Sequence, residues 1–457
     1  MTGATAALSG WAVGLRFDDL PDDVVDRMLR HTLDAIGAIA VGAERSWTAG
    51  VRAYAADESP DGRSSVPRLA RRLRPEWAAL ANGTAAHGFE IDDYALPGLS
   101  HPGSVVVPVA LALGEHVDSD GRELIAALAA GFETTVRFGE ACTPSLTSDR
   151  GFHVTSALGV FGAVAAAVRL MGLDARQAAA AYGIAASHAG GTAEFTRTGG
   201  DVKRLHAGMA AAGGIRSAAI AARGVTAPTA AIEGARGFLH TFVERARPEA
   251  LTHGLGREWA LRGLAMKRWC VCAGLQAPLA ALDAALAAGV PDASRIDDLI
   301  EITVRCDRAT LAHVGHIGGR PRDLTEAQMS VHHAIAMRLA AGGNDPAHYR
   351  RFEDGLAVAH LADLVRLEVD EEAERVFPRR LLAEVSLVTA HGTVTRRAEA
   401  PGSPGNPMSR EQTTEKFRAL CDPIIGERAA RAVIDAVEAM RSGGGARAVF
   451  AAMQEDA

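Results

Sequence analysis

Apolar residues recur at helical spacing through the first part of the chain. The segment 19–41 shows the pattern clearly, because its apolar side chains fall three or four positions apart. Asp19 is placed to cap this helix and Pro21 suits its first turn. Another helix is expected after Ser104, which is placed to cap it, with Pro108 tolerated if it lies in the first turn.

Ala-rich segments predict further helices. Asp174 and Gln177 form a capping-box pattern at the start of one of them. The apolar run from Val154 is too short and too rich in Gly and Ala to span a bilayer, so we expect a buried helix. Another helix is expected from Gly208. Because helix follows helix with no strand pattern, residues 1–266 are predicted to form an all-helical domain.

The pattern changes after residue 266. The run from Arg295, the segment from Leu364 and the segment from Ala383 contain alternating, β-branched stretches that predict strands. The last of these predicts a hairpin that turns at His391-Gly392. With helical segments between them, residues 267–400 are predicted to form a smaller α+β domain. A Pro/Gly/Ser link then leads into helices that complete the first domain over 401–457. The expected fold class is mainly α.

Composition narrows the class of protein. The 457 residues are 23% charged and 48% apolar, which is ordinary for a soluble globular protein. A net charge of -7 predicts no basic face, so we expect no nucleic-acid partner. Five cysteines and an N-terminus without a signal-peptide pattern favour reduced thiols in the cytoplasm, with no membrane association.

The segment 87–104 concentrates polar chemistry in a Pro/Gly-punctuated loop between apolar segments. It carries Glu90, Asp92, Asp93, Tyr94 and His101. Loops on a rigid scaffold often hold catalytic side chains, and a carboxylate beside an imidazole can transfer protons. A solvated acidic turn with a capping histidine explains the same residues, and this segment alone leaves both interpretations open.

Two further segments carry candidate side chains. His153 precedes the buried helix, where the helix dipole disfavours an imidazolium and suits a neutral base or donor. Lys203 and His206 lie three residues apart and would share a helix face after the flexible Gly199-Gly200 pair. A core histidine and a solvated basic segment are the alternatives.

The candidates in the second domain are cationic or imidazole groups. Lys267 at the predicted junction suits a carboxylate substrate as a point charge, although a surface lysine is equally compatible. Arg320 is a plausible bidentate anchor for a carboxylate. His313 and His316 could share a face, but no third ligand follows at a metal spacing.

Several cofactor and nucleophile motifs are absent from the sequence. It has no G-x-S-x-G elbow, P-loop, H-E-x-x-H or strand-linked dinucleotide fingerprint. With no signature for a metal or an organic cofactor, we expect acid–base chemistry by His, Lys and Asp/Glu.

The order of the polar motifs resembles the MmgE/PrpD family over essentially the whole chain. The motifs are H-x-x-x-x-D-D with a following H-P-G-S, then G-F-H, K-R-L-H-A-G-x-A-A and K-x-W-x-x-C. Members include 2-methylcitrate dehydratase, cis-aconitate decarboxylase and iminodisuccinate epimerase. The resemblance implies a homodimer, with a large helical domain and a smaller α+β lid domain inserted before the C-terminal helices, and no metal or organic cofactor.

The resemblance also implies an active site in a polar pocket between the two domains. The residues that match the family's motifs are Asp92 or Asp93, His101, His153, Lys203 and Lys267. Departures from the family pattern are Glu90 for an aspartate, Tyr94 for a threonine, Gln276 for a histidine, and Ile317 near the place of a lid tyrosine. We therefore expect a substrate other than 2-methylcitrate or cis-aconitate.

These observations predict a cofactor-independent lyase or isomerase that acts next to a carboxylate of a small organic acid. Dehydration, decarboxylation and epimerisation all remain open. His101 and His153 are assigned to acid–base steps, Asp93 to orientation or general base, and Lys203 and Lys267 to anion binding. The expected substrate contacts are Glu90, Asp92, Tyr94, His206, Gln276 and Arg320.

Two alternatives belong to other classes of protein. A non-catalytic ligand-binding or scaffold protein of the same fold is favoured by Tyr94, Gln276 and the absent lid tyrosine. The retained histidines and lysines oppose it. A metal-dependent hydrolase would rely on His313 and His316.

Overall fold

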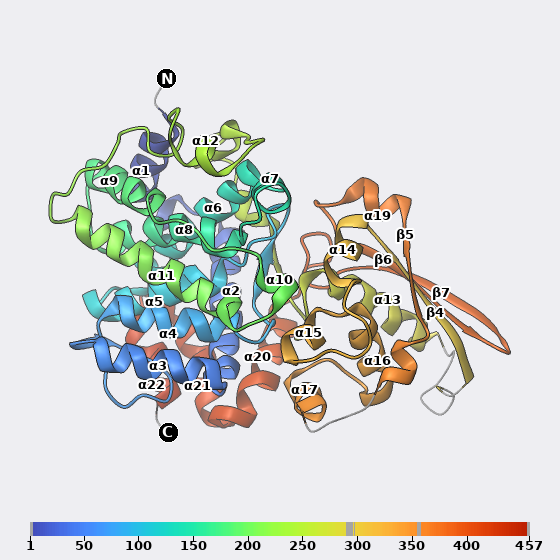
Figure 1. Cartoon of the computed structure of the whole chain (residues 1–457). Coiled ribbons are helices and arrows are strands. Elements are labelled where there is room, and N and C mark those ends of the chain that lie inside the picture. Colours follow the sequence, from blue (N-terminus) through green and yellow to red (C-terminus); the bar gives the residue numbers. More distant parts are fainter. Residues whose placement is uncertain (1–2, 289–295, 297, 354–357, 455–457) are drawn as a thin grey trace. The chain divides into compact units, whose positions relative to one another are not determined.

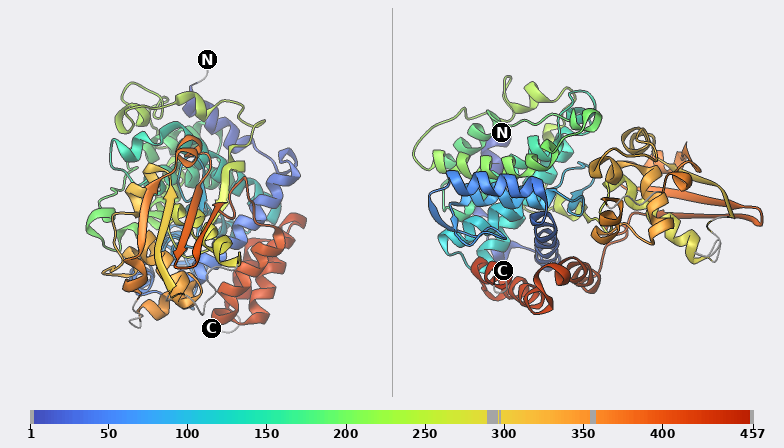
Figure 2. Two further views of the ribbon diagram at one scale, coloured as in Figure 1. Left: turned by 90° about the vertical axis from the view of Figure 1, so that its right-hand side faces the viewer. Right: turned by 60° about the horizontal axis from the view of Figure 1, so that its bottom comes forward.

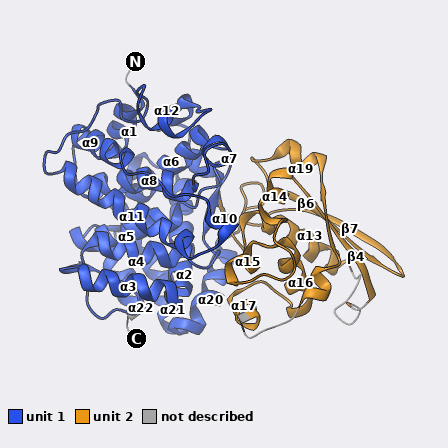
Figure 3. Ribbon diagram, viewed as in Figure 1, with its two compact units in different colours: residues 1–264, 409–457 blue, residues 265–408 orange. Residues whose placement is uncertain are grey.

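The computed structural model describes residues 3–288, 296, 298–353 and 358–454 (Figure 1). The chain divides into two compact units (Figure 3). Unit 1 consists of residues 1–264 and 409–457, and unit 2 of residues 265–408. The predicted fold class is confirmed, because the described chain is mainly α with a small sheet-containing region.

Unit 1 is built from helices of 9 to 22 residues. These are α1 (Ala4–Gly14), α2 (Asp22–Ala43), α3 (Ser46–Glu58), α4 (Pro75–His87), α5 (Gly103–Val117), α6 (Gly121–Cys142), α8 (Val154–Leu170), α9 (Ala175–Ala186), α11 (Val202–Ala221), α20 (Arg410–Ile425), α21 (Glu427–Ala439) and α22 (Ala446–Gln454). Shorter elements are α7 (Ser145–Ser148), α10 (Phe195–Thr198), α12 (Phe238–Phe242), β1 (Asp61–Ser64) and β2 (Asp93–Ala95). Strand β3 (Leu264–Met266) crosses the division between the units.

Two of the helix predictions are confirmed in detail. The run from Val154 forms α8, which is buried over nearly its whole length. At the start of α9, Asp174 accepts a hydrogen bond from the Gln177 backbone, and the Gln177 side chain accepts one from the Asp174 backbone. No helix among the described residues is both long and apolar enough to cross a membrane.

Two predictions of capping residues are wrong. Asp19 closes a short 3-10 turn by accepting from Arg16, and α2 begins at Asp22 after Pro21. Ser104 lies inside α5, which begins at Gly103, so Pro108 falls beyond the first turn. The Asp93 carboxylate takes the capping role expected of Ser104, because it accepts a hydrogen bond of 2.8 Å from the Gly103 backbone.

The helix expected from Gly208 begins six residues earlier, at Val202. It packs closely against α4, because a Cβ on Gly208 would lie 2.2 Å from the Leu80 carbonyl oxygen. Gly83 of α4 faces Gly208 in return, since its Cβ would lie 2.9 Å from the Gly208 Cα. Two facing glycines therefore allow the helix backbones to touch.

The C-terminal helices return to unit 1 (red in Figures 1 and 2). Helix α20 packs on α2, α21 packs on α20, and α22 packs on α21 and α5. Lys416 of α20 forms a buried ion pair of 2.5 Å with Asp34 of α2. The same ammonium donates to the Ile91 carbonyl oxygen over 3.0 Å.

Unit 2 is built around a four-stranded sheet in the order β5-β4-β6-β7 (left view of Figure 2). The strands are β4 (Leu299–Cys306), β5 (Val365–Val369), β6 (Leu382–Thr389) and β7 (Gly392–Glu399). The strand pair β4–β5 is parallel, whereas β4–β6 and β6–β7 are antiparallel. The predicted hairpin is confirmed, but its turn lies one residue earlier than expected, at Ala390-His391, because Gly392 already belongs to β7 and pairs with Thr389.

Helices cover the sheet and fill the rest of unit 2. They are α13 (Gln276–Ala287), α14 (Arg308–Val314), α15 (Leu324–Met329), α16 (Val331–Ala341), α17 (Pro346–Glu353), α18 (Ala359–Ala362) and α19 (Glu371–Val376). Helix α13 packs on β6 and β7. Arg295, where the first predicted strand run starts, lies outside the described residues, as do residues 354–357 of the segment expected to be helical.

Candidate active site

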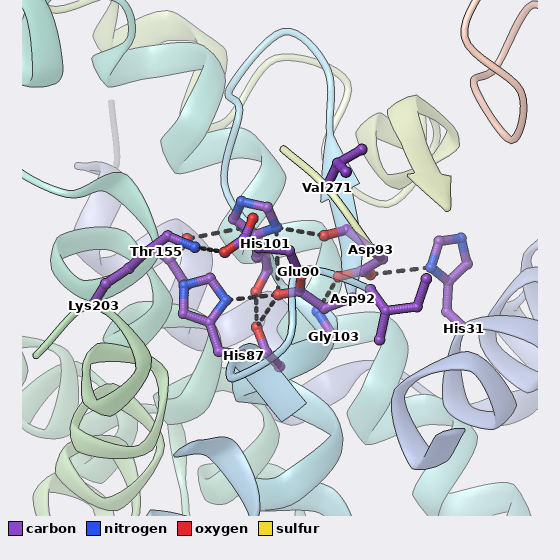
Figure 4. Close-up of polar contacts among 12 residues, drawn as sticks. His31, His87, Glu90, Asp92, Asp93, His101, Gly103, Thr155, Lys203 and Val271 are labelled. Atoms are coloured by element: carbon purple, nitrogen blue, oxygen red, sulfur yellow. Dashed lines mark hydrogen bonds and ion pairs between the residues drawn. The ribbon is translucent and has the colours of Figure 1, made fainter. Parts of the chain in front are cut away.

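A polar cluster forms where the end of α4 meets the loop that leads to α5. Asp92 lies at its centre and contacts two imidazoles and a hydroxyl (Figure 4). The distances from its carboxylate are 2.6 Å to His87 Nδ1, 3.4 Å to His101 Nδ1 and 3.2 Å to Ser104 Oγ. Asp92 and His87 are buried, and His101 is 12% exposed. His87, His101 and Ser104 thus all contact the carboxylate of Asp92.

The contacts of His101 fix which ring nitrogen carries its proton. Nδ1 lies 2.6 Å from the Asp93 backbone carbonyl oxygen, which can only accept a hydrogen bond. When the ring is neutral, Nδ1 is therefore its protonated nitrogen and Nε2 carries the lone pair. The His101 backbone N–H donates to Thr155 Oγ1 over 3.2 Å, which holds the residue against the start of α8.

Asp93 points away from Asp92 and toward α2 (Figure 4). Its carboxylate lies 3.0 Å from His31 Nδ1 and accepts from the Gly103 backbone. Burial, assisted by the charge of Asp92, raises the pKa of Asp93 to about 7. Burial also lowers the pKa of His31 to about 3, so this imidazole is neutral near pH 7. The geometry favours an orienting role for Asp93.

Lys203, at the start of α11, reaches into the cluster and forms an ion pair with Glu90 (Figure 4). Both side chains are buried. Glu90 has φ of 56°, a left-handed conformation that is uncommon for residues other than glycine. Because a buried charge needs a partner, this pairing keeps the ammonium in the cluster.

His153 and His206 form a second imidazole pair. His153 precedes the first residue of α8, as predicted, and its Nδ1 lies 2.9 Å from His206 Nδ1. Its ring stacks on His87 with 5.5 Å between centroids. Burial lowers the pKa of His153 well below its usual value, and that of His206 to about 4, with the charge of Lys203 contributing. Both rings are therefore neutral near pH 7.

Burial likewise lowers the pKa of His87 to about 3, although the charge of Asp92 opposes this. Neutral imidazoles around a carboxylate and an ammonium can both accept and donate a proton. The cluster can therefore perform acid–base chemistry on a small molecule.

The loop that carries Glu90 and Asp92 is held from two further sides. Arg204 donates to the Gly88 carbonyl oxygen over 3.1 Å, and its guanidinium lies 3.8 Å from the ring centroid of Trp47. Lys416 holds the Ile91 carbonyl oxygen. Consecutive residues of α11, Lys203 and Arg204, thus bind the side chain and the backbone of the same loop.

Of the residues that the structure describes, His87, Asp92 and His101 form a group whose potential ligand atoms lie within 4.8 Å of one another. Such a set could hold a divalent metal ion. The nitrogens that face Asp92 are the Nδ1 atoms, and that of His101 bears a proton bound to the Asp93 carbonyl oxygen. A metal ion at Nδ1 of His101 would have to displace this proton.

The predicted residues of unit 2 have local partners. Lys267 is fully buried. The Gln276 amide oxygen accepts from the backbones of Arg268 and Trp269, and its nitrogen donates to the carbonyl oxygens of Trp269 and Val271. Gln276 therefore fixes the segment after Lys267. Arg320 is 71% exposed and pairs with Asp363 over 2.9 Å.

The remaining candidates from the sequence are Tyr94 in unit 1 and two histidines in unit 2. Tyr94 is fully buried in β2 of unit 1. His313 and His316 belong to no potential metal group among the described residues. Within unit 1, the structure brings together Glu90, Asp92, Asp93, His101, His153, Lys203 and His206.

Three residues of the cluster were not singled out from the sequence. His87 begins the H-x-x-x-x-D-D motif, so its spacing to Asp92 was an available signal. His31 and Lys416 lie on α2 and α20, far from the loop in sequence, and nothing in their local sequence indicates their partners. Packing of α2, α4 and α20 brings them to the loop.

Comparison with known proteins agrees with the motif order. A model of the MmgE/PrpD N-terminal domain matches residues 6–251, and a model of the C-terminal domain matches residues 269–442. The chain belongs to the MmgE/PrpD family. Similar proteins include a cis-aconitate decarboxylase of Aspergillus terreus, 28% identical over 95% of this chain and 93% of that protein.

Two more MmgE/PrpD relatives cover nearly the full chain. The cis-aconitate decarboxylase-like protein oryM of Aspergillus oryzae is 30% identical, over 92% of this chain and 91% of its own length. Human cis-aconitate decarboxylase is 29% identical, over 90% of this chain and 86% of its own. Relatives with this name support a lyase-type family.

Proposed function

We propose that the protein is a lyase or isomerase that moves a proton at a carbon next to a carboxylate of a small organic acid. The single observation that carries this proposal is the cluster of neutral imidazoles around Asp92 and Lys203. Decarboxylation is the reaction named for the relatives. Dehydration and epimerisation use the same proton transfer at the same kind of carbon.

The proposed roles follow from the contacts. His101 is held through Nδ1, so Nε2 is the atom that accepts or returns the proton. An ammonium has three donors, so Lys203 can maintain its ion pair with Glu90 and also bind a substrate carboxylate. There it would stabilise the negative charge that develops when the carbon loses its proton or carboxylate. His153 is proposed as the second acid–base group, with His206 fixing its tautomer.

Lys267 is proposed as a second anion-binding group on the strength of its motif alone. Asp93 is proposed to orient the loop, because it binds His31 and the start of α5. The alternative of a non-catalytic scaffold would be favoured by a Lys203 side chain that faces solvent. Lys203 is instead 5% exposed and directed at Glu90.

The test is turnover of candidate dicarboxylic and tricarboxylic acids, cis-aconitate included, in deuterated water. Release of CO₂ identifies decarboxylation, loss of water identifies dehydration, and deuterium incorporation without net conversion identifies epimerisation. Lys203→Ala and His153→Ala should each lower turnover by about a hundredfold or more. His253→Gln, at a 77% exposed histidine, is the matched control. Activity within a few-fold of the parent in both site variants would refute the assignment.

We further propose that the chemistry needs no metal or organic cofactor and that the enzyme is a homodimer in the cytoplasm. Dialysis against a chelator should leave turnover unchanged. Metal analysis of the untreated protein should find less than one equivalent of any transition metal. A chelator-sensitive activity restored by one metal would instead assign an ion to His87, Asp92 and His101.

A further inference from the structure

A second pocket, with a volume of about 740 Å³, lies at the surface of unit 1. Its lining comes from β1, the start of α4, the end of α5 and the C-terminal part of α11. None of the residues that line it belongs to the polar cluster around Asp92. A pocket of this size is typical of sites for small molecules.

Four arginines line this pocket. They are Arg63 of β1, Arg74 just before α4, Arg216 of α11 and Arg223 just after α11. Among the described residues, none of the four forms an ion pair with a carboxylate. Arg216 and Arg223 each donate to a carbonyl oxygen of α11 through one nitrogen, which leaves other N–H groups of both guanidiniums for a ligand.

Two carboxylates also line the pocket and reduce its positive charge. Asp61 is paired with Arg71 over 3.4 Å. Glu76 lies in the first turn of α4, where the helix dipole stabilises a carboxylate. Four arginines against two carboxylates give the lining a net charge of about +2, although the whole chain carries -7. A positive pocket on an acidic protein indicates an anionic ligand.

The rest of the lining indicates which anion fits. Buried Leu113 and Ile215 line the pocket together with Val117 and Met171, so part of the ligand contacts apolar surface. Guanidinium groups bind phosphate oxygens through pairs of parallel hydrogen bonds. A phosphate carries more charge than a carboxylate and has three acceptor oxygens, so it can bind more than one arginine. A phosphate group attached to an apolar body matches both parts of the lining.

The pocket lies at the far ends of the two helices that carry His87 and Lys203. Pro75, the first residue of α4, and Arg216 of α11 line the pocket, whereas His87 ends α4 and Lys203 is near the start of α11. The two helices therefore run antiparallel. Roughly 18–20 Å of helix separates the pocket from the polar cluster.

We infer that this pocket binds an organic phosphate, with the phosphate groups on the arginines and the apolar part on the buried side chains. The pocket is separate from the polar cluster, so this inference goes beyond the proposed function and its test needs no turnover. A ligand that contacts both Arg74 and Arg223 would join the start of α4 to the end of α11. Its binding should therefore raise the thermal stability of the protein.

The experiment is isothermal titration calorimetry of the full chain with ATP, without magnesium and at constant ionic strength. The parent should bind ATP. Arg74→Gln combined with Arg223→Gln should weaken binding by about tenfold or more, because charged hydrogen bonds to phosphate are lost. Arg236→Gln combined with Arg431→Gln is the matched control, because both arginines are exposed in unit 1 and line no part of the pocket. Circular dichroism of each variant verifies its fold.

Two comparisons locate the binding and identify the part of the probe that binds. Lys203→Ala should bind ATP as tightly as the parent does, since Lys203 belongs to the other site. Inorganic tripolyphosphate should bind more weakly than ATP, because it has no part that contacts Leu113 and Ile215. Adenosine, which has no phosphate, should bind more weakly still.

Several results would overturn the inference. They are a parent that does not bind ATP, a folded double variant of Arg74 and Arg223 with unchanged affinity, and adenosine or tripolyphosphate that binds as tightly as ATP. Loss of ATP binding in Lys203→Ala would also overturn it, because ATP would then lie at the polar cluster. These outcomes are independent of whether the proposed chemistry is correct.

Discussion

The Nδ1 atom of His101 lies 2.6 Å from the backbone carbonyl oxygen of Asp93 and 3.4 Å from the carboxylate of Asp92. The ring is therefore anchored by its protonated nitrogen and polarised by a buried carboxylate. This is the arrangement that a general base requires, because the lone pair is held in one direction.

His101→Asn should separate the two functions of His101, which are the hydrogen bond from Nδ1 to the Asp93 carbonyl oxygen and the proposed proton transfer at Nε2. The asparagine amide can still donate to the Asp93 carbonyl oxygen, but it has no nitrogen at the place of Nε2. We expect kcat to fall by about a hundredfold or more with little change in stability. Steady-state kinetics and urea unfolding measure the two effects. A variant with kcat within a few-fold of the parent would remove His101 from the mechanism.

Asp93→Asn should reveal the raised pKa of Asp93. A carboxyl with a pKa of about 7 when folded, against an ordinary 3.8, binds its proton more tightly in the folded state. Its contribution to stability is therefore fully present below about pH 4 and is lost as the pH rises to about 7. From pH 5 to pH 8 the parent should lose about 2–3 kcal/mol relative to the variant.

Urea unfolding of both proteins across this range measures that difference. Titration of groups that do not contact Asp93 cancels between parent and variant. A difference that is constant with pH would contradict the assigned pKa of Asp93.

Glu90→Gln should leave the Lys203 ammonium buried beside a neutral amide. Breaking a buried ion pair from one side costs about 3–5 kcal/mol. Lys203→Met combined with Glu90→Gln removes both charges and should restore part of the lost stability. The double-mutant cycle, measured by urea unfolding, gives the coupling between the two groups. Additive effects would show that the pair contributes nothing as a pair.

Gly208→Ala should disrupt the contact between α4 and α11. The added Cβ would lie 2.2 Å from the Leu80 carbonyl oxygen and 2.5 Å from Thr84 Oγ1. We expect a destabilisation of about 1–3 kcal/mol or more, with a loss of activity, because the two helices carry His87 and Lys203. Gly10→Ala is the control. Gly10 lies within α1 with nothing within 4 Å of its Cβ, so alanine should stabilise by up to about 1 kcal/mol.

Much of the architecture was predictable because it depends on local patterns. Helical periodicity located α2, α8 and α9, and alternation located β6 and β7. The starts of helices were harder to predict, because they depend on partners distant in sequence. Ser104 has the right chemistry for a cap, but the Asp93 carboxylate binds the backbone N–H of Gly103 at the N-terminus of α5. The Ser104 hydroxyl lies within α5 and donates to Asp92 and to the His101 carbonyl oxygen.

The site was predictable as a set of residues but not as a network. Sequence motifs named His101, His153 and Lys203, yet they do not say which carboxylate binds which imidazole. The structure separates the adjacent Asp92 and Asp93 onto opposite sides: Asp92, just before β2, contacts His87, whereas Asp93, the first residue of β2, contacts His31. The Gln276 amide binds the backbone of residues 268, 269 and 271, which no pattern in the sequence indicates, and its role as a substrate contact stays a prediction.

The hydrogen bond from Lys416 to Ile91 has a consequence for biosynthesis. A ribosome makes the loop that carries Glu90 and Asp92 early and adds α20 only after the whole of unit 2 has been translated. Until then Asp34 lacks the ammonium that neutralises it, and the loop lacks one of its supports. A nascent chain stalled near residue 408 would thus hold every imidazole of the cluster and still lack the helix that binds Asp34 and the Ile91 carbonyl oxygen.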